Sequence, residues 1–274
     1  MRAQNLSISI PSGRPRCDRN CPYCVSLMTG FVQSDFQLMI KNAKKVLTVA
    51  RTAKVSSVLL TGKGEPMLNV GDTMRMIEDF NEYPLEIQTN GLVLSKDYTL
   101  IELLAEVGVN TISISIDNME TFKSFRNLYS KILACRMSVR ICFNVTTDVD
   151  WGKEQSLKKI IAMCQRVGIR QLLIRSLTIP NRAVDTPESK KAQKWIKAFG
   201  YPYNKVDEQF KKIKKNLIRV LNHGAGIYDV NGIAVSFSDY CIQEVNNTED
   251  IRSLIFLEDG HLYTSWNSKA SLLF

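Results

Sequence analysis

Three cysteines lie within eight residues near the start of the chain, in the sequence Cys17-Asp-Arg-Asn-Cys21-Pro-Tyr-Cys24. Three thiolates on one short loop can bind three irons of a [4Fe–4S] cubane and leave the fourth iron open to another ligand. The loop lacks the fourth nearby cysteine of a ferredoxin motif and the paired Cys or His residues that tetrahedral zinc requires. The spacing therefore favours a cluster with one open iron, and structural zinc is the weaker interpretation.

This CxxxCxxC spacing, with the aromatic Tyr23 before the last cysteine, resembles the signature of the radical S-adenosylmethionine (radical SAM) superfamily. In that family the open iron is chelated by the amino and carboxylate groups of S-adenosylmethionine. An electron then breaks a sulfur–carbon bond of this molecule and gives a 5′-deoxyadenosyl radical. The resemblance covers about residues 5–180. It implies an enzyme with two cofactors, a [4Fe–4S] cluster on Cys17, Cys21 and Cys24 and S-adenosylmethionine itself.

A second motif, Gly62-Lys63-Gly64-Glu65-Pro66, follows the apolar run of residues 55–60. It is similar to the family's Gly-Gly-Glu-Pro motif, with Lys63 in place of a glycine. The resemblance implies that backbone carbonyls of Gly62 to Gly64 and the side chain of Glu65 accept hydrogen bonds from the methionine ammonium group. Glycine suits such a place because the backbone must approach the ligand closely. Alone, the same sequence would be an ordinary turn.

Further polar residues lie at or near the ends of predicted strands. The resemblance implies that some of them contact the carboxylate and ribose of S-adenosylmethionine, or the substrate; the alternative is that they are ordinary polar residues at strand ends. The candidates are Thr89, Asn90, Ser113, Ser115, Asp117, Asn144 and Arg175.

The elements that must position these residues alternate between short β-type runs and longer helical patterns. Strands are predicted at residues 5–10, 55–60, 85–89, 111–116, 138–146 and 171–176, and helices between them at 34–54, 70–80, 96–107, 119–134 and 157–167.

Strands that alternate with helices predict a parallel sheet with right-handed crossovers. The fold class is therefore α/β, and six units favour a partial (β/α)6 TIM-like barrel over an open doubly wound sheet. In both architectures ligands bind at the carboxyl ends of the strands. The cysteine loop, the Gly62–Pro66 loop and Asn90-Gly91 all follow strands, so we expect them at one edge of the sheet.

The pattern changes after about residue 185. Residues 186–199 and 205–223 read as helices, and residues 232–238 and 254–266 as strands, the latter a hairpin around Asp259-Gly260. We therefore expect a core at residues 1–185 and a C-terminal helical and β-hairpin extension at 186–274 that packs on the core and closes the barrel or covers the substrate.

The net charge of +9 is concentrated in residues 151–220, which hold 17 Lys or Arg against 5 Asp or Glu. The plainer interpretation is a set of solvated helix faces. The alternative is an anionic partner, such as a nucleotide, a phosphorylated small molecule, an acidic peptide or RNA.

An odd number of cysteines, seven, with three of them clustered, favours metal binding in a reducing compartment over a disulfide framework. No apolar run approaches the length that spans a bilayer, and the absence of a secretory leader pattern predicts a cytoplasmic protein without a membrane contact. Cys241 is the one cysteine of the predicted extension. It is expected to be a buried thiol, or alternatively a hydrogen donor or fourth ligand near the substrate.

Three hypotheses follow. The first is a radical SAM enzyme acting on an anionic, nucleotide-like or peptide substrate, with an electron donor such as flavodoxin or ferredoxin. The second is a radical SAM enzyme that modifies RNA, for which binding would depend strongly on salt. The third is a non-catalytic iron–sulfur or zinc protein, which would not bind S-adenosylmethionine and would leave the Gly64-Glu65-Pro66 motif unexplained.

Overall fold

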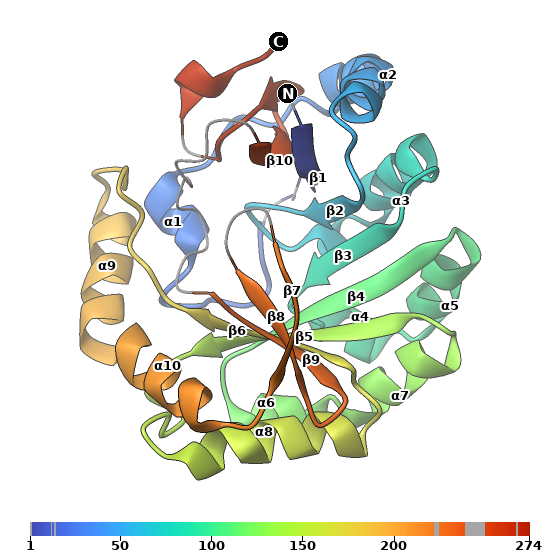
Figure 1. Cartoon of the computed structure of the whole chain (residues 1–274). Helices are drawn as coiled ribbons and strands as arrows, with labels where there is room; N and C mark the ends of the chain where they lie inside the picture. The colour runs from blue at the N-terminus through green and yellow to red at the C-terminus, as the bar shows by residue number, and fades with distance from the viewer. Residues whose placement is uncertain (1, 12, 14, 222–224, 239–249, 267) are drawn as a thin grey trace.

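The structure, a computed structural model, describes residues 2–11, 13, 15–221, 225–238, 250–266 and 268–274. One curved sheet with helices along its outer side dominates the architecture (Figure 1). The order of its eleven strands is β11-β10-β1-β2-β3-β4-β5-β6-β9-β8-β7. In the described part of the chain the two outermost strands do not pair with each other, so the barrel is partial, as the sequence predicts.

Six β/α units form the first part of the chain. Their strands are β1 Arg2–Ser9, β2 Val58–Thr61, β3 Leu85–Thr89, β4 Val109–Ile116, β5 Ser138–Val145 and β6 Gln171–Ser176. The intervening helices are α1 Val25–Thr29, α2 Phe36–Thr52, η1 Pro66–Leu68, α3 Val70–Phe80, α4 Leu92–Lys96, α5 Thr99–Glu106, α6 Met119–Ser124, α7 Arg126–Ala134 and α8 Glu154–Arg166.

The remaining elements extend this sheet at both edges. They are α9 Pro187–Phe199, α10 Tyr203–Lys212, β7 Asn216–Val220, β8 Gly226–Val230, β9 Ile233–Ser238, β10 Asp250–Phe256, β11 Leu262–Tyr263 and η2 Lys269–Ser271. Strand β10 pairs parallel with β1, with Leu254 opposite Leu6, and β9 pairs parallel with β6. The described strands of the extension therefore lie in the same sheet as the core.

The alternation Thr-Ile-Ser-Ile-Ser-Ile in β4 explains the two faces of the sheet. Ile112, Ile114 and Ile116 are fully buried in the main hydrophobic core, which includes the inner faces of the helices. Each such side chain contributes about 1.5–3 kcal/mol when it is removed from water. The serines between them point to the opposite face, because side chains alternate along a strand. The interior of the partial barrel is consequently polar.

Several predicted elements agree with the structure residue for residue: β3, β6 and α3. The helix predicted at 96–107 begins only at Thr99, since Lys96 ends the separate helix α4 and the chain is extended at Asp97, whose carboxylate accepts a hydrogen bond from the Thr99 N–H. The predicted helix at 119–134 is divided at Phe125.

The predicted helix at 205–223 is wrong for residues 213–221, and residues 222–223 lie outside the described residues. Apolar residues recur at helical spacing through Val206, Phe210 and Ile213, but the chain turns extended at Ile213. The following Asn216–Val220 segment forms β7, which pairs antiparallel with β8. Its β-branched residues Ile218 and Val220 favour a strand.

None of the helices in the described ranges combines the length and the apolar character of a bilayer-spanning segment.

Candidate functional site

The cysteine loop connects β1 to the short helix α1 at the carboxyl edge of the sheet. Two backbone hydrogen bonds give the loop a tight turn: Cys24 N–H donates to Cys21 O at 3.1 Å, and Leu27 N–H donates to Cys24 O at 3.2 Å. Cys24 stands immediately before α1. All three thiols line a single cavity of about 1030 Å³.

Two hydrogen-bond donors approach the Cys17 sulfur. The Arg19 N–H lies 3.4 Å from Sγ, and the Asn90 side-chain amide nitrogen lies 3.6 Å from it. N–H groups directed at a cysteine sulfur stabilise its thiolate and are among the features that tune iron–sulfur centres. Burial raises the pKa of Cys17 from its ordinary value, while both donors oppose this rise.

Burial also raises the pKa of Cys21 to about 11, although the nearby Arg19 guanidinium acts in the opposite direction. A cysteine must lose its proton to bind a metal, so cluster assembly on this loop releases protons. In the described part of the chain, no three His, Cys, Asp or Glu side chains lie close enough together to hold a single metal ion. The structure instead offers three thiols along the wall of one cavity.

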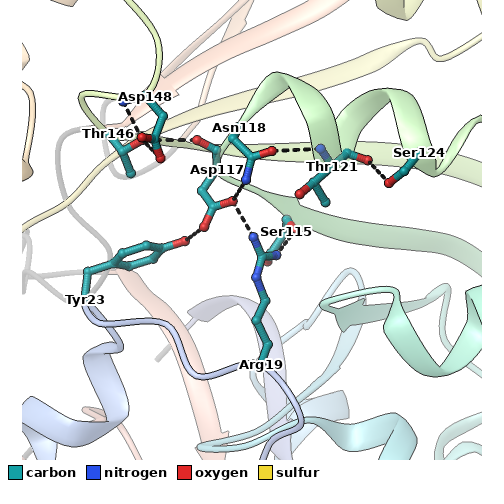
Figure 2. A network of polar contacts seen from close by, with 9 residues as sticks. All are labelled: Arg19, Tyr23, Ser115, Asp117, Asn118, Thr121, Ser124, Thr146 and Asp148. Atoms are coloured by element: carbon teal, nitrogen blue, oxygen red, sulfur yellow. Dashed lines mark hydrogen bonds and ion pairs between the residues drawn. The ribbon is translucent and has the colours of Figure 1, made fainter.

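Two side chains of the cysteine loop share the carboxylate of Asp117, which follows β4 directly (Figure 2). Tyr23 donates its hydroxyl hydrogen to Asp117 Oδ2 at 2.6 Å, and Arg19 binds Oδ1. Arg19 also donates to the carbonyl of Ser115 at 2.8 Å. Asp117 is not among the residues that line the cavity, and its carboxylate holds the cysteine loop.

The Gly62–Pro66 loop packs closely against the end of β1. A Cβ atom at Gly62 would lie 3.1 Å from the carbonyl oxygen of Ile10, which is tighter than ordinary contact. The Glu65 N–H donates to the carbonyl of Arg16 at 2.8 Å, so this loop is bonded directly to the residue before Cys17.

The Glu65 carboxylate is buried and joins this loop to the end of β3. Oε1 accepts from the Thr89 hydroxyl at 2.6 Å and from the Met67 N–H at 3.0 Å, and Oε2 accepts from the Asn90 N–H at 2.7 Å. Burial raises the pKa of Glu65, and these three donors oppose the rise. With both oxygens engaged, the Glu65 side chain fixes the Gly62–Pro66 loop to the end of β3.

Lys63 is also buried, and its ammonium group donates to the carbonyl of Gly30 at 2.6 Å. Burial lowers its pKa, while the more distant Glu258 and Asp259 act in the opposite direction. The residue that departs from the family pattern thus ties the loop after β2 to the end of α1.

Asn90 contacts both the cysteine loop and the next helix. Its amide nitrogen donates to Asp18 Oδ1 at 2.7 Å, and its Oδ1 accepts from the Leu92 N–H at 2.8 Å. The following Gly91 has φ +80°, and a Cβ there would lie 3.0 Å from the Phe125 ring. Only glycine fits this turn without strain.

The structure brings together nearly all of the residues that the sequence predicts for the site. Those that line the cavity are Cys17, Cys21, Tyr23, Cys24, Gly62, Lys63, Gly64, Glu65, Thr89, Asn90, Ser115, Asn144 and Arg175. Ser113 lies further down β4, opposite Arg140 in β5, and is not among the lining residues. Cys241 lies outside the described residues.

Sequence reasoning expected the C-terminal extension to close the barrel or cover the substrate, but it did not identify which residues of the extension line the cavity. Arg252 and Ser253 of β10, together with Thr264, Ser265 and Trp266 after β11, line the same cavity. A parallel pairing between β10 and β1 brings them there, and no local pattern in the sequence announces it.

Glu258 was also missed. It is fully buried after β10 and accepts from Arg16 Nη1 at 3.1 Å and from the Ser34 hydroxyl at 2.9 Å. A signal did exist, because Glu258 follows the apolar run Leu-Ile-Phe-Leu directly, where a charged residue needs a partner.

The arrangement fits a cubane with one open iron. Three thiols, N–H donors near one sulfur, a close-packed backbone loop and several polar side chains surround one cavity. The cavity volume of about 1030 Å³ is at the upper end of the range of ligand pockets, about 300–1,000 Å³.

The sequence profile of the radical SAM superfamily matches residues 13–182, more than half of the chain. A probable GTP 3′,8-cyclase from Pyrococcus abyssi is 23% identical over 226 residues, covering 76% of this chain and 66% of that protein. A GTP 3′,8-cyclase from Clostridium acetobutylicum is 29% identical over 118 residues, covering 41% of this chain and 36% of that protein. The match thus extends over no more than 66% of the length of these relatives.

Among solved structures, Streptococcus suis SuiB bound to S-adenosylmethionine matches with a TM-score of 0.59 at 13% identity, covering 97% of this chain and 60% of SuiB. SuiB bound to its precursor peptide SuiA matches with a TM-score of 0.57 at 12% identity. At such low identity the likeness shows the shared fold.

Proposed function

This chain belongs to the radical SAM superfamily and is an enzyme of that class; on this premise we propose that it cleaves S-adenosylmethionine reductively and abstracts hydrogen from an anionic, nucleotide-like small molecule. The observation that carries the proposal is the cavity that Cys17, Cys21 and Cys24 share with the Gly62–Glu65 loop and with a strongly cationic wall. When bound there, a [4Fe–4S] cluster supplies the electron that converts S-adenosylmethionine to methionine and a 5′-deoxyadenosyl radical.

We assign the residues of the cavity three tasks. The thiolates of Cys17, Cys21 and Cys24 hold three irons. The backbone of Gly62, Lys63 and Gly64 faces the methionine end of S-adenosylmethionine, kept in place by the buried Glu65 and Lys63 side chains. The remaining polar residues serve its carboxylate and ribose or the substrate: Tyr23, Thr89, Asn90, Ser115, Asn144 and Arg175.

Selectivity in such a reaction depends on enclosure. A primary carbon radical abstracts hydrogen from almost any C–H bond within reach, so the protein must position one bond and exclude solvent. The residues of β10 and those after β11 that line the cavity form the wall that the first six β/α units do not provide. We propose that residues 186–274 complete the substrate site of a core formed by residues 1–185.

The charges that line the cavity support an anionic substrate. Five cationic side chains line it (Arg19, Lys63, Arg175, Arg182 and Arg252), whereas among the described lining residues Glu65 is the only carboxylate. Arginine is the preferred partner of phosphate and carboxylate groups. The relatives named GTP 3′,8-cyclase act, by their name, on a nucleoside triphosphate, and such a molecule matches this charge.

The first experiment is anaerobic reconstitution of the purified chain with iron and sulfide, followed by dithionite and S-adenosylmethionine. We expect 5′-deoxyadenosine, detected by chromatography, and its loss in Cys21→Ala. Cys142→Ala is the matched control, because this buried cysteine of β5 lies outside the loop. Zinc in place of iron, without binding of S-adenosylmethionine, would instead support the non-catalytic hypothesis.

The charge of the substrate is tested by titrating the reconstituted protein with GTP and with guanosine. We expect GTP to bind at least about tenfold more tightly, since a charge-assisted hydrogen bond to phosphate contributes about 1.5–3 kcal/mol. The preference should shrink in Arg252→Gln. Equal binding of GTP and guanosine would exclude an anionic nucleotide as the ligand of this cavity.

RNA is a second candidate, favoured by one observation. Helix α9 packs against α1 beside the cavity and exposes Lys190, Lys191, Lys194 and Lys197 to solvent. An RNA substrate predicts tRNA binding that weakens steeply with salt, and weakens uniformly when these lysines are replaced.

A further inference from the structure

Asp117 is placed to control the cysteine loop, although it does not line the cavity. Its two carboxylate oxygens bind different side chains of that loop: Oδ2 accepts from the Tyr23 hydroxyl at 2.6 Å, and Oδ1 forms an ion pair with Arg19. Arg19 also donates to the carbonyl of Ser115 at 2.8 Å. One carboxylate of β4 thus holds the loop at two points (Figure 2).

The position of these two points matters for the thiols. Arg19 lies between Cys17 and Cys21, and Tyr23 lies between Cys21 and Cys24. Every bond from Asp117 to the loop therefore constrains backbone on one side or the other of Cys21. The loop has no regular secondary structure before α1, so side-chain contacts must supply much of its rigidity.

Asp117 is itself fixed from three directions. The Asn118 side-chain amide donates to Asp117 Oδ1 at 2.8 Å, while Asn118 Oδ1 caps helix α6 by accepting from the Thr121 N–H at 2.7 Å. The Thr146 hydroxyl donates to the Asp117 carbonyl at 3.1 Å. Asp117 therefore connects the cysteine loop to β4, to α6 and to the end of β5.

The surroundings make these contacts strong. The side chains of Arg19 and Asp117 are only 17% and 14% exposed. Tyr23 is buried and packs against Trp195 of α9, with 5.3 Å between ring centroids. Charge-assisted hydrogen bonds between largely buried groups are stronger than those between exposed groups.

We propose that Asp117 is a positioning residue that sets the geometry of Cys21 and Cys24 through Tyr23 and Arg19, and thereby tunes the cluster which these thiols hold. The inference rests on the proposed function, because it requires a cluster on the loop. It assigns Asp117 a role in which it contacts neither S-adenosylmethionine nor substrate.

The test compares Asp117→Asn with Asp148→Asn after reconstitution. Asp148 is an exposed carboxylate of the same polar network, bonded to Thr146 and not to the cysteine loop. For Asp117→Asn we expect an altered electron paramagnetic resonance spectrum of the reduced cluster and faster cluster loss in air. The rate of 5′-deoxyadenosine formation should fall by about ten- to a hundredfold, the range for loss of a charge-assisted hydrogen bond. Asp148→Asn should match the wild type in all three.

Two further variants separate positioning from a general loss of structure. Tyr23→Phe removes only the hydroxyl bond and keeps the ring against Trp195, and Arg19→Lys keeps the charge but removes the two-point contact. We expect each to change the spectrum in the same direction as Asp117→Asn but less. These two variants decide the question if Asp117→Asn fails to fold by circular dichroism.

The outcomes are distinct from those of the proposed function. If the wild type forms no cluster or no 5′-deoxyadenosine, the proposed function fails and this inference fails with it. If the wild type is active and all three variants keep its spectrum and its cluster lifetime, the proposed function stands and Asp117 has no positioning role.

Discussion

Two carboxylates, Asp117 and Glu258, hold basic residues at the cysteine loop from opposite sides. Asp117 follows β4 of the core and binds Arg19 and Tyr23 between the cysteines. Glu258 follows β10 of the extension and binds Arg16, which precedes the first cysteine. The loop is thus fixed internally by the core and at its start by the extension.

The surroundings of the two carboxylates differ as much as their positions. Glu258 is fully buried, and besides Arg16 it binds the Ser34 hydroxyl, while its backbone carbonyl accepts from the Asp35 N–H at 2.7 Å. It therefore joins the extension to the start of α2 as well as to the loop. This difference indicates that Glu258 mainly stabilises the fold, whereas Asp117 mainly governs the geometry of the thiols.

The largest expected effect comes from removing the extension as a whole, which tests the role assigned to Glu258. A chain ending at residue 185 loses β9 and β10, which flank the parallel strands of the core. We expect it to lack a cooperative unfolding transition, because β1 and β6 become uncovered edges. Urea titration followed by circular dichroism checks this. A cooperatively folded 1–185 fragment would show that Glu258 and its strand are dispensable for the fold.

Glu258→Gln should lower the free energy of unfolding by about 2 kcal/mol, since it removes the charge of a fully buried carboxylate that pairs with the one-third exposed Arg16. Urea denaturation of the iron-free protein measures the change. We expect the resonance spectrum of the reconstituted cluster to stay that of the wild type. A spectrum altered as strongly as that of Asp117→Asn would remove the distinction between the two carboxylates.

A smaller effect on stability, which depends on pH, is expected from Lys63, whose ammonium group interacts electrostatically with Glu258. Burial lowers the pKa of Lys63, so the unfolded chain binds more protons than the folded chain above that pKa. The wild type should therefore gain stability relative to Lys63→Met as the pH rises from 7 toward the ordinary lysine pKa of about 10.4.

Urea titrations of both iron-free proteins at pH 7 and pH 10 measure this change. Both proteins contain the same cysteines and tyrosines, so the effects of their titration on stability cancel when the two proteins are compared. If the difference in free energy of unfolding between the two proteins stays constant with pH, or shifts in favour of Lys63→Met as the pH rises, the Lys63 ammonium group is not buried at this site.

The smallest effect is expected at an ion pair away from both carboxylates. Arg51 of α2 pairs with Glu82 at the surface, where water screens the charges. Arg51→Ala should leave the denaturation midpoint and the cluster spectrum unchanged within error. A clear loss in either measurement would mean that charge changes anywhere on this protein perturb it, and would weaken the interpretation of the Glu258 and Asp117 variants.

Local patterns in the sequence predicted most of the core. The runs Leu85–Thr89 and Gln171–Ser176 are apolar, β-rich and bounded by turns, so their limits could be predicted residue for residue. The cysteine spacing and the Gly64-Glu65-Pro66 motif identified the site because their residues lie close together in sequence.

Features that depend on distant pairs could not be predicted in this way. Glu258 meets Arg16 across 242 residues, and only the pairing of β10 with β1 makes that contact possible. Asp117 was recognised as a site residue, but its partners in the loop were not, because a strand-end carboxylate has the same sequence signature whether it binds a ligand or a side chain. The helix expected beyond Lys212 failed because Ile213 and Leu217 happen to continue a helical spacing.

The parallel pairing of β1 with β10 also affects how the chain folds. Residues 2–9 are synthesised well before residues 250–256, which form one of their two neighbouring strands, so that edge of β1 stays unpaired until β10 has been made. Contacts so far apart in sequence slow folding, because a long loop must close before they form. The cysteine loop, tethered through Arg16 to the same late strand, should therefore reach its final shape only near the end of folding. We therefore expect cluster assembly to work best when iron is supplied after β1 has paired with β10.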